Sequence, residues 1–331
     1  MIITRTPFRI SLFGGGTDYP KWYQDHGGAV LGMAIDKYCY ISLRRLPPFF
    51  AHRHRIVYSR IENVRELSEI EHPAVRAVLQ EDGVEDGLEI HHDGDLPARS
   101  GMGSSSSFTV GLLHALSALR GRMATKRHLA EEAIRIEQHV IGENVGSQDQ
   151  IWAAFGGLNR IDFRQDGAFT VSPLIVPRTR ETELLGHMML FFTGLSRHAS
   201  EIARSQIENM GRRAAQLRAM RAMVDEAQSI LANPGADIRL LGHMLNDAWM
   251  LKRELASNVT TGAIDEMYQA GCEAGAIGGK VLGAGGGGFV LFFVEPANQA
   301  AVRERLKSLI EVTFDIDTSG SSVVLYNPNG F

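Results

Sequence analysis

Three glycine-rich segments constrain this chain more than any other feature of its sequence. They cover residues 14–16, 101–103 and 283–288. Glycine loses more conformational freedom on folding than any other residue, so clusters of it are typical of places where the backbone turns sharply or lies against a ligand. A glycine-rich turn that precedes a helix is a common phosphate site. The three segments therefore indicate that the protein binds phosphate groups.

The middle segment is predicted to begin a helix. Residues 101–107 directly precede Phe108, Leu112, Leu116 and Leu119, which recur at helical spacing. The first N–H groups of a helix lack internal partners and attract anions. The lysine of a P-loop is absent, so backbone and hydroxyl groups would hold the phosphates. An ordinary serine N-cap is the local alternative. The predicted ATP-binding residues are Gly101, Met102, Gly103, Ser104, Ser105 and Ser106.

The third segment matches the pattern G-x-G-x-x-G, which occurs in dinucleotide-binding folds. Such a fingerprint must open a helix. Here it precedes residues 289–294, Phe-Val-Leu-Phe-Phe-Val, an apolar run typical of a buried strand. The context therefore argues against a dinucleotide-dependent oxidoreductase.

Composition indicates a globular protein. The chain has 331 residues, of which 44% are hydrophobic and 22% charged, and this length favours two domains, placed at 1–177 and 178–331. A formal net charge of −4 argues against a general nucleic-acid binder. With no apolar run long enough to span a membrane and only two cysteines, Cys39 and Cys272, we expect a cytoplasmic protein with reduced thiols and no membrane partner. The sequence does not predict the oligomeric state.

The hydrophobic pattern mixes strands and helices, so the predicted fold class is α+β. Strands are predicted at 2–4, 9–12, 29–31, 38–43, 88–91, 187–192, 289–294 and 322–325. Helices are predicted from about 73, after 104, and at about 126–141, 197–231, 237–255, 262–274 and 299–310.

Taken together, residues 7–18, 96–107 and 280–288 resemble motifs one, two and three of the GHMP kinases, in the order and spacing of that family. The resemblance covers nearly the whole chain. It implies an N-terminal domain like ribosomal protein S5, a ferredoxin-like C-terminal domain, and an active site between them that uses ATP and Mg²⁺. The Gly-Gly-Gly-Thr-Asp form of motif one resembles the branch with heptose 7-phosphate kinases and fucokinases. Chain length and residues 193–197 favour the heptose phosphate members.

The resemblance implies two catalytic residues. Asp149, in the segment Gly-Ser-Gln-Asp-Gln, matches the position where galactokinase-type members carry a catalytic aspartate, and it would be the general base. Arg9 in motif one would stabilise charge on the transferred phosphoryl group. The local alternatives are an aspartate favoured by a helix dipole and a surface arginine on a strand.

The resemblance also implies the metal and acceptor residues. A serine of motif two, by position Ser105, would hold Mg²⁺ together with Glu137, although a solvated glutamate is the alternative. Gly15 and Gly16 stand where galactokinases carry Glu-His, so a bulkier sugar could approach the backbone. From their place at the start of the predicted long helix rather than from the resemblance, Arg197 and His198 could meet a substrate phosphate, and Lys280 is a second possibility. A plain surface charge is the alternative for each of the three. The predicted substrate-binding residues are Gly15, Gly16, Thr17, Asp18, Arg197, Gly285 and Gly286.

The sequence thus favours an ATP-dependent kinase acting on a small-molecule sugar phosphate. The resemblance supplies the substrate, D-glycero-D-manno-heptose 7-phosphate, phosphorylated on its anomeric hydroxyl to the 1,7-bisphosphate. A fucokinase-like or other hexose kinase is the alternative within the family. A catalytically silent sugar and ATP sensor is the alternative from another functional class.

Overall fold

The computed structural model describes residues 1–98, 100–195 and 199–329. Its larger sheet is built on two long antiparallel strands, β1 (Ile2–Phe13) and β2 (Gly28–Arg45). The strand order is β12-β1-β2-β5-β3-β4, and β6 and β7 extend the sheet from β2. The remaining bounds are β3 His54–Val57, β4 Ile61–Val64, β5 Leu88–Gly94, β6 Leu158–Phe163, β7 Phe169–Pro173 and β12 Ser322–Tyr326.

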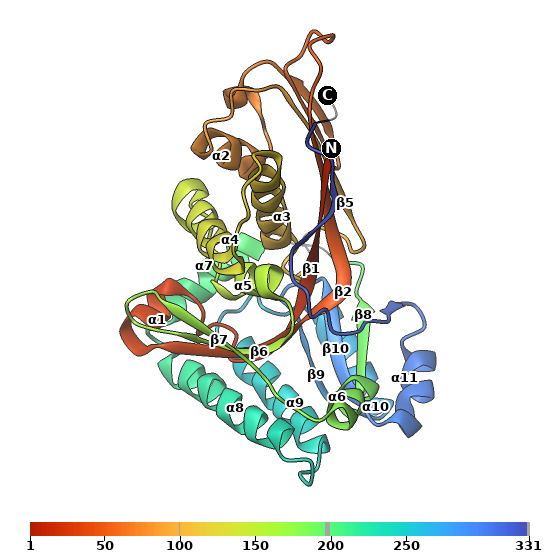
Figure 1. The fold of residues 1–331 in the computed structure, drawn as a ribbon. Coiled ribbons are helices and arrows are strands. Elements are labelled where there is room, and N and C mark those ends of the chain that lie inside the picture. Colours follow the sequence, from red (N-terminus) through yellow and green to blue (C-terminus); the bar gives the residue numbers. More distant parts are fainter. Residues whose placement is uncertain (99, 196–198, 330–331) are drawn as a thin grey trace.

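Helices α2 (Pro73–Glu81), α3 (Ser104–Leu119), α4 (Lys126–Arg135) and α5 (Gln148–Phe155) lie on one side of the long strands (Figure 1). The apolar stripe that predicted α3 is buried, as expected: Phe108, Leu112, Leu116 and Leu119 are each at most 8% exposed. Gly111 lets α3 approach β1 closely, because a Cβ at this position would lie 2.9 Å from Thr6 Oγ1. Thr4 Oγ1 also donates a hydrogen bond to Gly111 O at 2.9 Å. The packing of α3 on β1 fixes where the helix N-terminus lies.

The second sheet has the order β11-β8-β10-β9 and is antiparallel throughout. Every residue of β10 is buried, in agreement with the apolar run that predicted it. Helix α9 approaches β9 at two glycines, since a Cβ on Gly278 would lie 2.1 Å from Gly242 O. The bounds are β8 Met188–Phe192, β9 Ala276–Val281, β10 Phe289–Val294, β11 Ile310–Val312, α1 Pro20–His26, α6 Arg178–Gly186, α7 Ala199–Asn209, α8 Ala214–Ala232, α9 Arg239–Arg253, α10 Gly262–Glu273 and α11 Gln299–Arg305.

Several elements differ from the sequence prediction. The strands predicted at 2–4 and 9–12 are parts of one strand, β1. The helix predicted over 197–231 is two helices, α7 and α8, because the chain turns at residues 210–213 around Gly211. The strands predicted at 29–31 and 38–43 are parts of one strand, β2. The last turn of the helix predicted at 126–141 is a π-helix, Ile136–Ile141. The helix predicted to 310 ends at Arg305, and β11 begins at Ile310.

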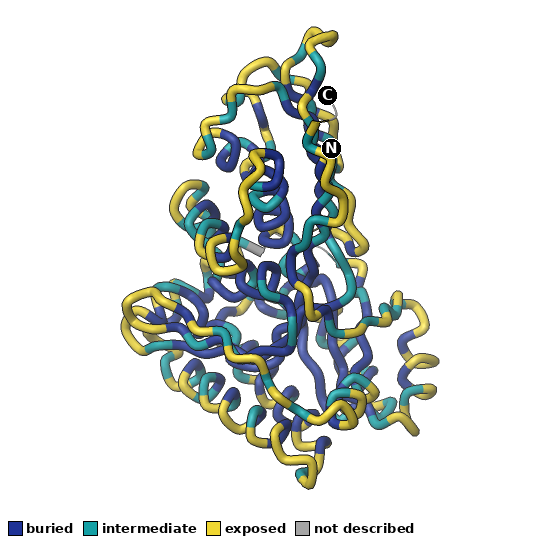
Figure 2. The backbone as a smooth tube through the Cα atoms, in the orientation of Figure 1, coloured by how far each residue is buried: buried dark blue, intermediate teal, exposed yellow. Residues whose placement is uncertain are grey.

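The buried residues follow both sheets and the helix faces turned toward them (Figure 2). The last strand, β12, returns to pair with β1, so the C-terminal end of the chain completes the first sheet. The predicted boundary at 177/178 falls between β7 and α6, and it stays a prediction. Within the described residues, no helix has the length and apolar character needed to cross a membrane. Cys39 and Cys272 are free thiols.

Candidate active site

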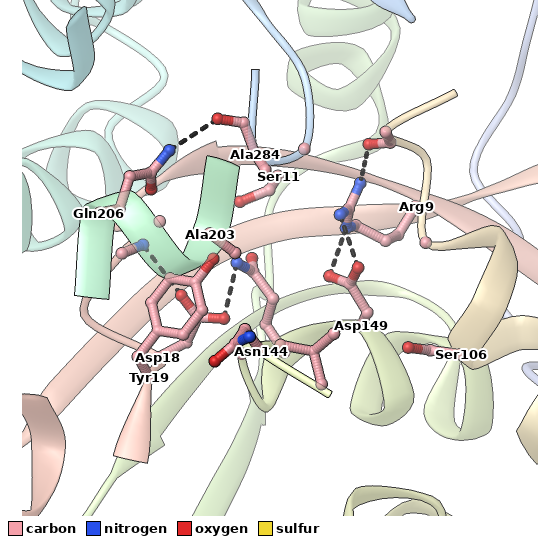
Figure 3. Close-up of a pocket in the computed structure, with 18 of the residues that line it drawn as sticks. Arg9, Ser11, Asp18, Tyr19, Ser106, Asn144, Asp149, Ala203, Gln206 and Ala284 are labelled. Carbon is pink, nitrogen blue, oxygen red and sulfur yellow. Dashed lines mark hydrogen bonds and ion pairs between the residues drawn. The ribbon is translucent and has the colours of Figure 1, made fainter. Parts of the chain in front are cut away.

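A cavity of about 310 Å³ lies where the three glycine-rich segments meet. Figure 3 shows Arg9, Asp18, Ser106 and Asp149 around it. The structure brings most of the predicted site residues to its wall: Arg9, Gly15, Gly16, Asp18, Gly101, Gly103, Ser104, Ser105, Ser106 and Asp149. Segments more than 250 residues apart in sequence thus form one pocket, because Gly283 of the third segment also lines it.

Arg9 and Asp149 form a two-pronged ion pair in this cavity. Arg9 Nε donates to Asp149 Oδ1 and Nη2 donates to Oδ2, both at 2.7 Å. Nη1 donates to Gly101 O at 2.7 Å, so the guanidinium also ties β1 to the turn before α3. The Arg9 side chain is 5% exposed and that of Asp149 is 25% exposed. The buried arginine therefore fixes the position of the carboxylate, and the carboxylate stays accessible from the cavity. Such a bidentate pair fixes the orientation of the carboxylate.

The N-terminus of α3 has the features of an anion site. Its cap residue is Gly103, in the left-handed conformation with φ of 79°, so no serine acts as the cap that the local alternative required. Ser107 Oγ donates to Pro7 O at 2.8 Å and holds the helix start against β1. Ser104 and Ser105 line the cavity. Backbone N–H groups and hydroxyls at this helix end can therefore meet a phosphate, as the sequence predicts.

Glu137 is hydrogen-bonded to Ser106, the residue next to its expected metal-binding partner Ser105, and the assignment of Ser105 and Glu137 to Mg²⁺ stays a prediction. Ser106 Oγ donates to Glu137 Oε2 at 2.9 Å, and Gln150 Nε2 donates to the same oxygen at 2.5 Å. Ser105 is exposed and lines the cavity. Successive helix residues point about 100° apart, so neighbouring serines face different ways.

The second oxygen of Glu137 fits a metal ligand. Glu137 is 1% exposed, and its Oε1 has no hydrogen-bond partner within the described part of the chain. Burial raises the pKa of Glu137 to about 7, against the hydrogen bonds of Thr109, Ser106 and Gln150, which lower it. A buried carboxylate with one unpaired oxygen beside a hydroxyl is a donor set that Mg²⁺ accepts. No larger cluster of His, Cys, Asp and Glu suited to a metal occurs among the residues described.

Asp18 is a second buried carboxylate in the cavity wall. Its Oδ1 accepts from Gly16 N and its Oδ2 accepts from Gln148 Nε2, each at 2.9 Å. Burial, and then the charge of Asp149, raise the pKa of Asp18 to about 6. Gly146 packs directly against this carboxylate, since a Cβ there would lie 1.9 Å from Asp18 Oδ2. Asp18 is thus held at the cavity wall close to the Arg9–Asp149 pair.

The remaining predicted ATP-binding and substrate-binding residues lie behind the cavity wall or outside the residues that the structure describes. Thr17 is fully buried, and its hydroxyl lies 2.8 Å from Gly14 O, so it supports the turn. Gly286 N donates to Val259 O at 2.8 Å, and Gly285 packs on the same carbonyl. Met102 is buried, with its carbonyl accepting from Arg9 N. Arg197 lies outside the described residues.

Sequence reasoning missed several polar side chains in or behind the cavity, among them Gln148, Gln150 and Lys252. The glutamines flank Asp149 on both sides, a signal that could have found them. Lys252 stands in the last turn of α9, where basic residues are common for the helix dipole alone. The position of Lys252 in the sequence therefore gave no indication that it lines a functional site.

Two family patterns match the chain. Residues 69–157 match "GHMP kinases N terminal domain", and residues 219–311 match "GHMP kinases C terminal". Among curated proteins, the chain is 29% identical over 308 residues to a D-glycero-alpha-D-manno-heptose 7-phosphate kinase of Campylobacter jejuni, covering 90% of this chain and 91% of the relative. It is 25% identical to a galactokinase of Thermococcus kodakarensis, covering 93% and 94%. It is 23% identical to a bifunctional fucokinase/GDP-fucose pyrophosphorylase of Arabidopsis thaliana, covering 96% of this chain but 32% of that protein.

Solved structures share the fold. A D-glycero-D-manno-heptose 1-phosphate kinase from Bacteriodes thetaiotaomicron superposes with a TM-score of 0.72 at 23% identity, covering 98% of both chains. A galactokinase of Lactococcus lactis in complex with galactose gives a TM-score of 0.73 at 19% identity, covering 97% of this chain and 94% of that one. Both similarities extend over nearly the whole chain.

Proposed function

Because the chain belongs to the GHMP kinase family and is an ATP-dependent sugar kinase, we propose that it phosphorylates the anomeric hydroxyl of D-glycero-D-manno-heptose 7-phosphate. The product of that reaction is the 1,7-bisphosphate. The observation that carries the proposal is the Arg9–Asp149 pair, which faces one cavity shared by the N-terminus of α3 and the Asp18 turn. A carboxylate held in this way between a phosphate site and an acceptor site suits phosphoryl transfer.

In this proposal Asp149 is the general base. The acceptor oxygen forms a bond to the γ-phosphorus of ATP, the bond from that phosphorus to the ADP oxygen breaks, and the hydroxyl proton passes to Asp149. Arg9 holds both carboxylate oxygens and so sets the direction in which Asp149 faces the acceptor. Its positive charge also offsets charge that develops on the transferred group.

The nucleotide phosphates are assigned to the loop before α3, where Gly101, Gly103 and the adjacent serines offer N–H and hydroxyl donors. Ser106 and Glu137 are the residues that would hold Mg²⁺. When bound, the metal supplies positive charge that offsets the charge of the phosphates. Ser105 remains a candidate phosphate contact rather than a partner of Glu137.

The acceptor is assigned to the Asp18 turn. The carboxylate of Asp18 can accept hydrogen bonds from sugar hydroxyls. A Cβ on Gly15 would meet its nearest atoms only at 3.6 Å, from Ser11 Oγ, and at 3.9 Å, from Gln148 Nε2. These are ordinary contact distances, and Gly15 lines the cavity, so the absence of a side chain there leaves that part of the cavity to the acceptor. The name of the Campylobacter jejuni relative supports a heptose phosphate as that sugar.

A kinase of a free hexose is the second candidate, and the relatives named as galactokinase and fucokinase favour it. It uses the same Arg9–Asp149 pair and differs in the acceptor alone. A panel of free sugars and sugar phosphates therefore separates the two candidates.

The mechanism is tested by Asp149→Asn, which keeps the size of the side chain and removes the base. We expect turnover to fall by about a hundredfold to ten-thousandfold with the Kd for ATP changed by less than about threefold. Asp166→Asn, an exposed aspartate that pairs with Arg164, is the matched control and should leave turnover unchanged. Full activity in Asp149→Asn would contradict the proposed mechanism.

A further inference from the structure

Two lysines with buried ammonium groups face the cavity from the second half of the chain. Lys252, on α9, is 7% exposed and Lys280, on β9, is 3% exposed, and both line the cavity. Neither forms an ion pair within the described part of the chain. Burying an ammonium group is unfavourable unless hydrogen bonds or an opposite charge replace the lost water. The proposed mechanism gives neither lysine a role, so their burial requires another explanation.

The hydrogen bonds of these lysines satisfy only part of their capacity. An ammonium group has three donors. Lys252 Nζ donates to Val281 O at 3.0 Å and to Gly283 O. Lys280 Nζ donates to Leu12 O at 2.8 Å, its one acceptor among the residues that the structure describes. In their charged forms the two lysines have six N–H donors, of which three are used, so three are available to an anion in the cavity.

Ser11 adds an unpaired donor in the same wall. It is 6% exposed and lines the cavity, yet its Oγ has no hydrogen-bond partner within the described ranges. It precedes Leu12, whose carbonyl holds Lys280. A Cβ on Gly15, in the Asp18 turn, would lie 3.6 Å from Ser11 Oγ. The hydroxyl is therefore on the side of the cavity assigned to the acceptor (Figure 3).

We propose that Lys252, Lys280 and Ser11 form a subsite for an anionic group carried by the acceptor, namely the phosphate monoester of a sugar phosphate. The proposal rests on the proposed kinase function and narrows its substrate class. It places the acceptor phosphate in the cavity, beside these three residues. The sequence instead favoured Arg197 as the phosphate contact. The alternative occupant is the γ-phosphate of ATP, which has the same chemistry and which the experiment below distinguishes.

The local charges agree with such an occupant. The charged groups that act on the lysines are the cation of Arg9 and the carboxylate of Asp18. The nearby carboxylate of Asp149 already pairs with Arg9. Burial, then the charge of Arg9, lower the pKa of Lys280 to about 7, and burial, then the charges of Lys280 and Arg9, lower the pKa of Lys252. A phosphate dianion between the lysines would favour their charged forms. The single negative charge of Asp18 does not neutralise the positive charges of both lysines.

The test uses Lys252→Gln and Lys280→Gln, because glutamine keeps an N–H donor for the carbonyls and removes the charge. ADP release is followed with heptose 7-phosphate and with the same heptose lacking the phosphate. We expect the KM for the phosphorylated acceptor to rise by about tenfold or more in each variant, with the KM for the free heptose and for ATP changed by less than about threefold. Equal effects on both acceptors, or a rise in the KM for ATP instead, would overturn the proposal.

Lys126→Gln is the matched control, since Lys126 Nζ also donates to a backbone carbonyl, Phe155 O, but does so outside the cavity. Thermal unfolding of each variant shows whether it is folded. A Ser11→Ala variant repeats the test without touching a charge and should raise the same KM by a smaller factor.

A second arm does not depend on turnover. Inorganic phosphate is titrated into the protein with the nucleotide loop filled by Mg²⁺ and a non-hydrolysable ATP analogue, and binding is followed by ³¹P line broadening. We expect binding in the wild type and in Lys126→Gln, and a loss of about tenfold or more in affinity in the two cavity variants. If the protein binds phosphate but turns over no sugar, the proposed kinase function is wrong and the proposed phosphate subsite stands. Binding unaffected by both substitutions would refute the subsite.

Discussion

Asp18 and Glu137 are two buried carboxylates whose burial is energetically unfavourable in the absence of a ligand. Both carboxylates are at most 1% exposed, and burial raises the pKa of each. Their charges are offset by neutral donors rather than by ion pairs: Gly16 N and Gln148 for Asp18, Ser106 and Gln150 for Glu137. A carboxylate kept in this state is poorly stabilised until a ligand arrives. Such groups cluster at functional sites.

The first prediction concerns Asp18 and pH. Its folded pKa, about 6, lies above the unfolded value of 3.8, so its favourable contribution is fully present below 3.8 and is lost as the pH rises through 6. Relative to Asp18→Asn, the free energy of unfolding of the wild type should therefore fall by about 2 kcal/mol between pH 4.5 and 8. Urea unfolding at both pH values measures this. A difference that is constant with pH would contradict the buried, ionisable Asp18.

The second prediction concerns the two-pronged pair. Arg9→Lys keeps a positive charge but loses the fork that holds Asp149 and the third donor to Gly101 O. We expect kcat to fall by about a hundredfold. Arg303→Lys is a matched control, because Arg303 forms a similar two-pronged pair with Glu311 at the surface. Steady-state kinetics of both variants decide the point, and an equal, small effect in the two would contradict a positioning role for Arg9.

Sequence reasoning could find Arg9, Asp18 and Asp149 because each stands within a recognisable motif, and the cavity brings them together. It named Ser105 as the serine that shares a metal with Glu137, whereas the hydrogen bond to Glu137 in the structure comes from the next serine, Ser106. At the first turn of a helix, each residue turns the side chain by about 100°, so the choice between adjacent serines depends on how α3 sits on β1. The role of Lys252 could not be predicted from sequence, because its position in the cavity wall depends on contacts with β9 and with the third glycine-rich segment.

At the scale of elements, loop-to-loop packing through glycine brings the second and third motifs together. Gly101 and Gly283 both have positive φ, 78° and 68°. A Cβ on Gly283 would lie 2.5 Å from the Gly101 Cα. The two loops can therefore lie in contact only while both positions lack a side chain. The sequence indicated glycine clusters near a ligand, but this contact between distant loops required the three-dimensional structure.

The third prediction follows from this contact. Gly283→Ala should force the two loops apart, and the new alanine would have to adopt the left-handed backbone conformation of Gly283. We therefore expect the free energy of unfolding to fall by about 1–3 kcal/mol. The KM for ATP should rise by about tenfold, because Gly101 lies in the loop assigned to the phosphates. Gly262→Ala is the control, since nothing lies within 4 Å of a Cβ there. Chemical denaturation and ATP kinetics test both effects, and a neutral Gly283→Ala would refute the tight contact.

The π-helical turn at Ile136–Ile141 is an element that periodicity did not predict. The apolar stripe of α4 continues into it, so the sequence pattern reads as one regular helix. A π-turn shifts the register of the residues it contains, and such turns are common at functional sites. Here the turn contains Glu137, whose Oε2 it places against Ser106 and Gln150. The sequence thus identified the glutamate but not the backbone feature that presents it.

At the scale of the whole molecule, the chain closes on itself. β12 pairs with β1, and the segment before it is anchored by Asp317, which accepts from Ser319 N, Gly320 N and Tyr38 Oη. Ser321 Oγ lies within hydrogen-bond distance of Thr6 Oγ1. Strand patterns predicted that β12 exists, but periodicity carries no information about its partner. The α+β class follows from sequence, while this return to the first sheet follows from tertiary packing.

The fourth prediction tests that closure. A chain that ends after residue 316 loses β12 and Asp317 and leaves the edge of β1 unpaired. We expect a Tm at least about 4 °C lower, or aggregation during purification. A chain that ends after residue 326 keeps β12 and is the control. A truncation at 316 with the Tm of the full chain would show that the C-terminal return contributes nothing to stability.

The central claim is that this cavity transfers the γ-phosphoryl group of ATP to the anomeric hydroxyl of a heptose phosphate. The most direct measurement incubates the protein with Mg²⁺, ATP and a panel of free sugars and sugar phosphates, follows ADP release, and locates the new phosphate by ³¹P NMR. The account predicts turnover of D-glycero-D-manno-heptose 7-phosphate with a new anomeric phosphate. Turnover of free hexoses alone, or no turnover of any acceptor in the panel, would contradict it.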